Sequence, residues 1–398
     1  MILQKGAQMN ELNSILFPLL RSVLCNEELD KSIFSNADPD TFKRLYLLSK
    51  KHDLAHLVST AIDKAQLQPD VETSKMFTKQ QMLAVYRYEN IIFEQNQVCK
   101  TLDEAGIPYI LLKGAVIRNL YPEPWMRTSC DIDVLVKETD VDRAAELLIK
   151  TLGYKQGEKP SFHDVPLYSV SGMHIELHFN INETIEEIDR VLMRVWDYAV
   201  PVSKNASEHV LTKEFFIYHF VAHASYHFVN GGCGLRTIFD LWLLCQKWEY
   251  DENKVIELCR EGDLERFYLV LRELSEVWFG DCEHNKLTQK TEKYILSGGT
   301  YGTQEAKIAA TQEARRGKIG YVLSRMFVSY EHLKYKYPSL KCKTISPIYQ
   351  VRRWFDVFKE KKASVYAREL NTTTRLKSEK IDEISLLMKD LNLNKHIK

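Results

Sequence analysis

The apolar positions of the first hundred residues recur at the three- and four-residue spacing of amphipathic helices. The same spacing returns after residue 182. In one early segment the apolar positions are Leu12, Ile15, Leu16, Leu19, Leu20, Val23 and Leu24. Most of the chain is therefore predicted to be helical.

A different pattern separates these two helical regions. Short apolar runs bounded by polar residues cover Ile110–Leu112 and Asp131–Val136, and they predict buried strands. An amphipathic helix is predicted over Asp140–Leu152. A further alternating run over residues 168–179 turns at Ser171–Gly172, which predicts a hairpin.

Together these patterns predict an α+β fold, with a small sheet and flanking helices embedded in mostly helical N- and C-terminal regions. The predicted segments are a helical region over 1–100, an α/β core over 101–182, a helical domain over 183–300, and a helical extension with an exposed tail over 301–398. No apolar run approaches the ~20 residues that a membrane-spanning helix needs, so no membrane partner is expected.

Charge and cysteine content narrow the functional classes. Lysine plus arginine and aspartate plus glutamate both number 54, so the formal net charge is zero. A neutral chain gives no general support for binding long nucleic acid, although it allows a local basic cleft. The eight cysteines form no C-x-x-C pair, which argues against a zinc ribbon or a thioredoxin-like motif. Without a signal peptide, they predict reduced thiols in a cytoplasmic protein.

Candidate chemistry is concentrated in the second predicted strand. Side-chain alternation places Asp131 and Asp133 on one face, and Ile132 and Val134 on the other. Two adjacent carboxylates repel unless a cation lies between them, and such oxygen ligands suit Mg²⁺ together with nucleotide phosphates. The alternative is a pair of solvated acids at a strand start, which is the commoner meaning of an isolated D-x-D.

The predicted hairpin carries a further acid. His174, Glu176 and His178 share one face of its second strand. Glu176 is the only downstream acid that lies within such an apolar strand pattern. A solvent-facing strand would produce the same alternation. A zinc site made by the three residues is a second alternative, although ligands along one flat strand spread apart.

The segment from residue 111 to 136 reads LLKGAVIRNLYPEPWMRTSCDIDVLV. Its L-K-G, Y-P and R-x-S-x-D-I-D-x-L-V elements resemble the uncharacterised bacterial nucleotidyltransferases of the DNA polymerase β-like superfamily. The resemblance implies a small mixed nucleotidyltransferase sheet. It also implies an enzyme dependent on Mg²⁺ (or Mn²⁺) that moves an NMP from an NTP to a hydroxyl group and releases pyrophosphate. The chain departs from the wider superfamily at Lys113–Gly114–Ala115, which replaces a glycine–serine motif.

The same resemblance assigns roles to individual residues. Asp131, Asp133 and Glu176 are the implied catalytic residues and metal ligands, and Glu176 also helps to activate the acceptor hydroxyl. The implied nucleotide- and phosphate-binding residues are Lys113, Gly114, Arg127, Ser129, Arg236 and Asp240. The last two come from a G-x-R-x-x-x-D helix that follows a histidine-rich helix, so the domain over 183–300 is expected to complete the active-site cleft. His178 and His223 are candidate cleft residues.

Several alternatives remain open. Gly231–Gly234 could be only an interhelical turn beside histidines that pack in the core, and Asp240 could pair with Arg236 rather than contact the nucleotide. The acceptor could be a protein side chain, a tRNA end or a small molecule. For the whole chain, the alternative is a non-catalytic nucleotide-binding or protein-interaction module on a degenerate nucleotidyltransferase fold.

Overall fold

The computed structural model describes residues 2–35, 39–157, 162–299, 302–314, 326–328, 330–337, 339–359 and 378–397, together with residues 320, 323 and 372. The chain forms two compact units. The first consists of residues 1–224 and 234–288, and the second of residues 225–233 and 289–398. All described strands belong to the first unit.

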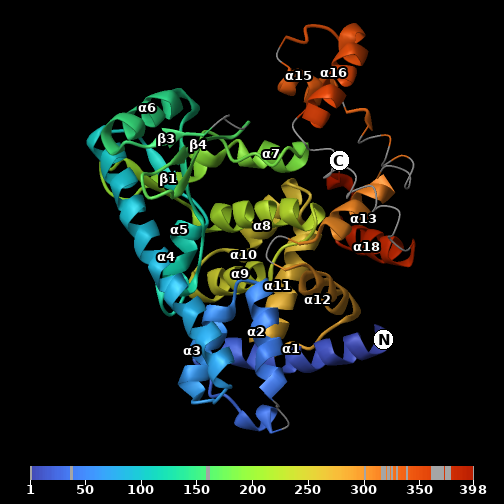
Figure 1. Cartoon of the computed structure of the whole chain (residues 1–398). Helices are drawn as coiled ribbons and strands as arrows, with labels where there is room; N and C mark the ends of the chain where they lie inside the picture. The colour runs from blue at the N-terminus through green and yellow to red at the C-terminus, as the bar shows by residue number, and fades with distance from the viewer. Residues whose placement is uncertain are drawn as a thin grey trace. The chain divides into compact units, whose positions relative to one another are not determined.

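The first unit begins with four helices, as the hydrophobic spacing predicts. They are α1 (Ile2–Leu24), α2 (Pro39–Lys51), α3 (Ala55–Ala65) and α4 (Val71–Glu104) (Figure 1). The carboxylate of Asp70 caps α4 by accepting hydrogen bonds from two backbone N–H groups of its first turn. Along its length α4 packs against α3, against α6 (Val141–Leu152) and against the central strand β2 (Asp131–Val136).

A mixed seven-stranded sheet follows, in the order β3-β4-β5-β2-β1-β7-β6. β2 is antiparallel to β1 and parallel to β5, while β4 and β5 form the predicted hairpin. The strands are β1 (Tyr109–Leu111), β2 (Asp131–Val136), β3 (Lys155–Gln156), β4 (Asp164–Tyr168), β5 (His174–His178), β6 (Ala199–Pro201) and β7 (Glu208–Leu211). The predicted α+β class, with a small mixed sheet, is confirmed.

The two faces of this sheet differ in chemistry. On one face, Ile132, Val134, Ile175 and Leu177 pack into a buried core with residues of α4 and α6. Because side chains alternate along a strand, the acids between these apolar residues point to the opposite face. Burial of the apolar positions therefore determines which face carries the candidate chemistry.

The expectation that the chain is only helical after residue 182 is wrong at β6 and β7. β7 pairs in parallel with β1, and β6 pairs with β7 at the edge of the sheet. Of the residues in these two strands only Leu211 is buried. Backbone pairing rather than a buried face defines them, so they show no hydrophobic alternation in the sequence.

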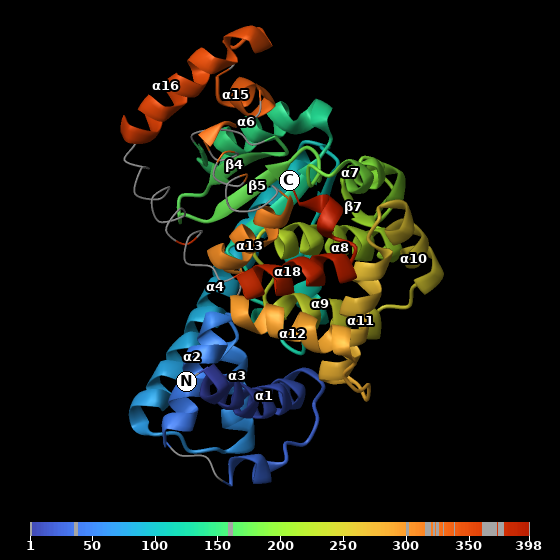
Figure 2. The same ribbon diagram turned by 90° about the vertical axis from the view of Figure 1, so that its right-hand side faces the viewer.

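Five helices accompany and follow these strands. They are α7 (Glu186–Leu192), α8 (Lys213–Val229), α9 (Leu235–Lys247), α10 (Glu252–Glu261) and α11 (Glu265–Phe279). α11 packs against both α9 and α10 (Figure 2). α9 also contacts the short helix η2 (Arg118–Leu120), and this contact brings α9 next to the segment that leads into β2.

In the second unit, α13 (Gln304–Ala314) packs against α18 (Ser378–Asp390) (Figure 2). α18 is the amphipathic helix predicted near the C-terminus, and it buries Ile384, Leu387 and Met388. The helices α12 (Lys286–Gly298), α15 (Tyr330–Lys336) and α16 (Ser346–Lys359) also lie wholly or mostly in this unit. Parts of the predicted exposed tail fall outside the described residues. No described helix combines the length and apolar composition that a membrane crossing requires.

Candidate functional site

β2 and β5 bring three acids to one face of the sheet. The two strands are parallel, and their register pairs Asp131 with His174 and Asp133 with Glu176. Paired residues on neighbouring strands point to the same face. The predicted placement of Asp131, Asp133 and Glu176 on one face is therefore confirmed, while their roles stay predictions.

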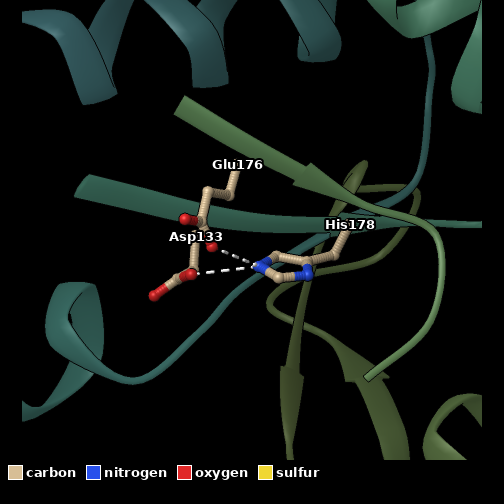
Figure 3. Close-up of side chains that lie close together, drawn as sticks. All are labelled: Asp133, Glu176 and His178. Atoms are coloured by element: carbon tan, nitrogen blue, oxygen red, sulfur yellow. Dashed lines mark hydrogen bonds and ion pairs between the residues drawn. The ribbon is translucent and has the colours of Figure 1, made fainter. Parts of the chain in front are cut away.

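Asp133, Glu176 and His178 form a compact group on this face (Figure 3). One possible ligand atom from each lies within 4.8 Å of the other two. His178 Nε2 is 3.0 Å from Asp133 Oδ1 and 3.4 Å from Glu176 Oε2. Asp133 and His178 are buried, whereas Glu176 is partly exposed. The group differs from the predicted triad, because it includes His178 and leaves Asp131 beside it.

Charge holds this group together. Burial alone would raise the pKa of Asp133, but the Lys113 ammonium and His178 hold it well below its usual range. Burial alone would lower the pKa of His178, but hydrogen bonds to Asp133 and Glu176 raise it to about 9. His178 is therefore protonated at neutral pH and acts as a cation between two carboxylates.

Asp131 is the acid whose pKa responds to the neighbouring carboxylates. Burial and the carboxylates of Asp133 and Glu176 raise the pKa of Asp131. A divalent cation would remove this repulsion, and carboxylate oxygens are the ligands that Mg²⁺ and Mn²⁺ prefer, so the donor set fits such an ion. A zinc site of His174, Glu176 and His178 is less well supported. His174 Nδ1 is 3.6 Å from Glu176 Oε1, but His174 lies outside the compact group.

The turn between β1 and α5 (Gly114–Ile117) brings a second cation to the acids. Lys113 has a φ of 33°, a left-handed conformation that residues with a side chain rarely adopt. Its Nζ lies 3.7 Å from Asp133 Oδ1. Burial alone would lower the pKa of Lys113, but Asp133 and the other nearby acids raise it. A strained residue thus keeps an ammonium charge within the site, and such strain is typical of functional positions.

Close packing explains the glycine that follows. A Cβ at Gly114 would lie 2.8 Å from Arg127 Nη1 and 3.4 Å from Ser129 Oγ. Three of the predicted phosphate-binding residues, Gly114, Arg127 and Ser129, are therefore brought together next to Lys113. A guanidinium, a hydroxyl and an ammonium group at one position form a donor set suited to phosphate oxygens.

Residues 38–280 match the family described as "Uncharacterised nucleotidyltransferase", which covers more than half of the chain. The chain belongs to this family. A solved structure, the Thermotoga maritima CCA-adding enzyme complexed with tRNA, is similar at 12% identity over 79% of this chain and 82% of that chain. Its TM-score of 0.21 is too low to support a structural argument. No curated protein matches the chain in sequence.

The nucleotidyltransferase family match extends into α9, where Asp240 pairs with Arg127. Arg127 Nη2 donates to Asp240 Oδ2 at 2.9 Å, and Nε lies 3.3 Å from both carboxylate oxygens. The Tyr121 hydroxyl donates to Asp240 Oδ1 at 2.8 Å. Asp240 is buried, and the Arg127 side chain is 10% exposed. Asp240 thus pairs with Arg127 and not with Arg236, the partner that helical spacing suggests.

Arg236 holds another part of the same loop. Its Nη1 donates to Asp53 Oδ2 at 3.1 Å, and to both Oγ1 and the carbonyl oxygen of Thr128 at 2.9 Å. The Thr128 hydroxyl donates to the same Asp53 oxygen at 2.6 Å. Asp53 lies in the turn between α2 and α3, so α9 and the N-terminal helices both hold the loop before β2. Direct contact of Arg236 or Asp240 with a nucleotide stays a prediction.

The two candidate cleft histidines lie in different surroundings. His178 belongs to the compact group, whereas His223 on α8 has its Nδ1 2.9 Å from Glu183 Oε1. Burial and the Lys113 charge hold the pKa of His223 well below its usual value, so the imidazole is neutral. The charges of Lys113 and Asp133 both influence this pKa, while a role of His223 in a cleft stays a prediction.

Sequence reasoning missed four residues of this region: Asp53, Arg118, Tyr121 and Glu183. Tyr121 enters the sequence analysis only within the Y-P element, without a role of its own, and Asp53 and Glu183 lie in segments without a chemical motif. Their partners are distant in sequence, so no local pattern connects them. Arg118 did carry a signal, because a cation within the short apolar segment after Gly114 is unusual.

Proposed function

We propose that this protein is a divalent-metal-dependent nucleotidyltransferase that moves an NMP from an NTP to an acceptor hydroxyl and releases pyrophosphate. The register that sets Asp133 beside Glu176, on the face that also bears Asp131, carries the proposal. The carboxylates of Asp133 and Glu176 make it harder to ionise Asp131, and a cluster of acids of this kind is typical of a site that binds a ligand. Membership of the nucleotidyltransferase family supports the same reaction class.

The acids divide the chemistry between them. Asp131, Asp133 and Glu176 would hold Mg²⁺ or Mn²⁺, and the bound ion supplies charge that neutralises the triphosphate and the leaving pyrophosphate. Glu176 is the more exposed member of the compact group, and its carboxylate would accept the proton of the acceptor hydroxyl. His178 would hold the side chains of Asp133 and Glu176 in place from the buried side.

The cations would bind the phosphates. Lys113, half-buried beside Asp133, would contact a phosphate oxygen through its ammonium group. Arg127 would present its Nη1 next to Gly114, since Asp240 already binds the other edge of the guanidinium. Ser129 would add a hydroxyl donor. Arg236 and Asp240 would contribute by fixing the loop, and His223 would line the cleft.

The candidate acceptors are a protein side chain, a tRNA end and a small molecule. A non-catalytic nucleotide-binding module is the alternative for the whole chain. It differs from the enzyme in one measurable way, because a module binds NTP and metal without releasing pyrophosphate.

Pyrophosphate release tests the proposal. Purified protein is incubated with each NTP, with Mg²⁺ or Mn²⁺ and with a cell extract as the source of acceptor. Asp131→Ala/Asp133→Ala serves as the control, because it removes two acids and leaves the apolar face of β2 intact. Pyrophosphate release by the wild-type protein but not by the double variant would support nucleotidyl transfer. An NTP labelled at its α-phosphate would then identify the acceptor. If both proteins are folded by circular dichroism and equally silent, the enzyme proposal fails. NTP binding that requires Asp133 would then favour the module.

A further inference from the structure

Arg118 is a buried cation that the chemistry described above does not use. It is 1% exposed and is among the largest fully buried side chains of the described structure. Its Nε donates to the Gly114 carbonyl oxygen at 2.8 Å, and its Nη2 donates to Ser129 Oγ at 3.0 Å. Both acceptors are uncharged. Among the described residues no carboxylate forms an ion pair with Arg118, although Asp131 attracts it over a longer distance.

The buried Arg118 guanidinium is protonated at neutral pH, and burying its charge destabilises the protein. Burial and repulsion by the Arg127 guanidinium lower the pKa of Arg118 to about 10, which still leaves it protonated at neutral pH. Arg127 is neutralised by Asp240, but Arg118 has no comparable partner. A buried charge without a counter-ion destabilises the protein that carries it. The corner around Gly114 therefore retains one positive charge that the described side chains do not neutralise by contact.

Ser129 connects this buried charge to the accessible part of the site. Its Oγ accepts a hydrogen bond from Arg118, so the single hydroxyl proton points away from the guanidinium. Ser129 is only partly buried, and its Oγ lies over Gly114 beside Arg127 Nη1. A hydroxyl donor and an N–H donor at one place, backed by an extra positive charge, match an oxyanion.

We propose that Arg118, Ser129 and Arg127 form an anion subsite for a phosphate group, in which Arg118 positions the Ser129 hydroxyl and supplies the charge that the anion neutralises. The identity of the phosphate as part of an NTP rests on the proposed function, but anion binding itself does not. The buried charge destabilises the free protein, and a bound anion would remove this destabilisation by neutralising the charge.

An anion subsite and a purely structural role predict opposite effects of replacing Arg118 on the stability of the free protein. If Arg118 only stabilised the fold, its removal would destabilise the protein. In an anion subsite, removing the charge should leave the free protein at least as stable while it weakens anion binding. The local hydrogen bonds allow this result, because the Gly114 carbonyl oxygen also accepts the backbone N–H of residue 118.

The experiment uses the full-length protein and inorganic tripolyphosphate, which carries the phosphates of an NTP without sugar or base. Arg118→Met keeps an apolar stem and removes the charge, and Ser129→Ala removes the hydroxyl. Calorimetry measures the Kd, and thermal unfolding without ligand measures stability. Arg143→Met is the matched control, because exposed Arg143 on α6 also donates to a carbonyl oxygen, that of Ala105.

We expect Arg118→Met to raise the Kd at least about tenfold, as for the loss of a charge-assisted contact. Its thermal midpoint should equal or exceed that of the wild-type protein. Ser129→Ala should also weaken binding, and the double variant should bind no more weakly than Arg118→Met, because the two residues act together. Arg143→Met should bind like the wild-type protein.

Four results would overturn the proposal. A thermal midpoint of Arg118→Met well below wild type would assign the residue to stability. An unchanged Kd would place the anion elsewhere, and additive losses in the double variant would separate Ser129 from Arg118. No tripolyphosphate binding by the wild-type protein would remove the subsite. Pyrophosphate release is measured separately, so an inactive protein that binds tripolyphosphate through Arg118 would refute only the proposed function.

Discussion

Gly114 lies between the two cations that adjoin the acids. Lys113 before it reaches Asp133, and Arg127 Nη1 occupies the space where a side chain at position 114 would begin. The end of an arginine side chain usually shifts at little cost. Here the other edge of the guanidinium is fixed by buried Asp240, and the Arg127 side chain is only 10% exposed, so its head has little freedom to move.

Gly114→Ala is therefore expected to lower the free energy of unfolding by about 1–3 kcal/mol, the usual cost of an added methyl group in a filled space. Urea denaturation measures the change. Gly298→Ala is the matched control, since its added Cβ would meet no atom within 4 Å. Equal urea midpoints for the two variants would show that Arg127 moves aside freely and that its position is not fixed by Asp240.

The repulsion among the three acids leads to a prediction about metal ions. Mg²⁺ or Mn²⁺ should raise the thermal midpoint of the wild-type protein, because an ion that binds only the folded state stabilises it. Asp133→Asn should lose most of this rise, since it removes a ligand charge next to Glu176. Glu146→Gln, which changes an exposed acid on α6, should retain it. A rise of equal size in Asp133→Asn would place the ion elsewhere.

At the level of elements, the loop before β2 is held from several sides. α9 contributes Asp240 and Arg236, and the turn between α2 and α3 contributes Asp53. α3 adds His56, whose Nε2 is 2.7 Å from the Met126 carbonyl oxygen. Two segments far apart in sequence, α9 and the stretch of residues 53–56, thus position the loop that carries Arg127 and Ser129.

Asp240→Asn tests how much this arrangement depends on charge. The change removes the buried counter-ion of the Arg127 guanidinium, which is itself 10% exposed, and breaking a buried ion pair destabilises proteins by about 3–5 kcal/mol. Urea denaturation should show a loss of this order. Glu265→Gln is the comparison, because its pair with Arg260 is exposed, and it should leave the urea midpoint unchanged. A similar midpoint for Asp240→Asn and wild type would mean that Arg127 finds another partner.

The limits of sequence reasoning follow from the same elements. Strand alternation alone places Asp131 and Asp133 on one face, since that property is local. The pairing of Asp133 with Glu176 needs the register between β2 and β5, which no local pattern contains. The partner of Asp240 could not be predicted either. Helical spacing suggests Arg236, but Arg127 lies 113 residues away in sequence and reaches the carboxylate through tertiary packing.

At the level of the whole molecule, positive and negative side chains balance at 54 each. The same balance holds inside the site, where Lys113 pairs with Asp133 and Arg127 pairs with Asp240. Arg118 is the exception. The corner around Gly114 thus retains one positive charge, which suits a single phosphate group better than a long polyanion.

The overall charge balance of the chain predicts weak binding of bulk tRNA with only a modest dependence on salt. The affinity of a protein for nucleic acid falls with salt in proportion to the number of phosphates that it neutralises, and 6–10 contacts cost about 10³–10⁵-fold between 50 and 200 mM salt. With about two contacts the fall should be about tenfold. Filter binding over this salt range measures it, with tripolyphosphate as competitor. Tripolyphosphate should displace the tRNA, because both would use the same few cations. A steep salt dependence that resists this competitor would reveal a basic surface away from the site and would make a tRNA end the leading candidate for the acceptor.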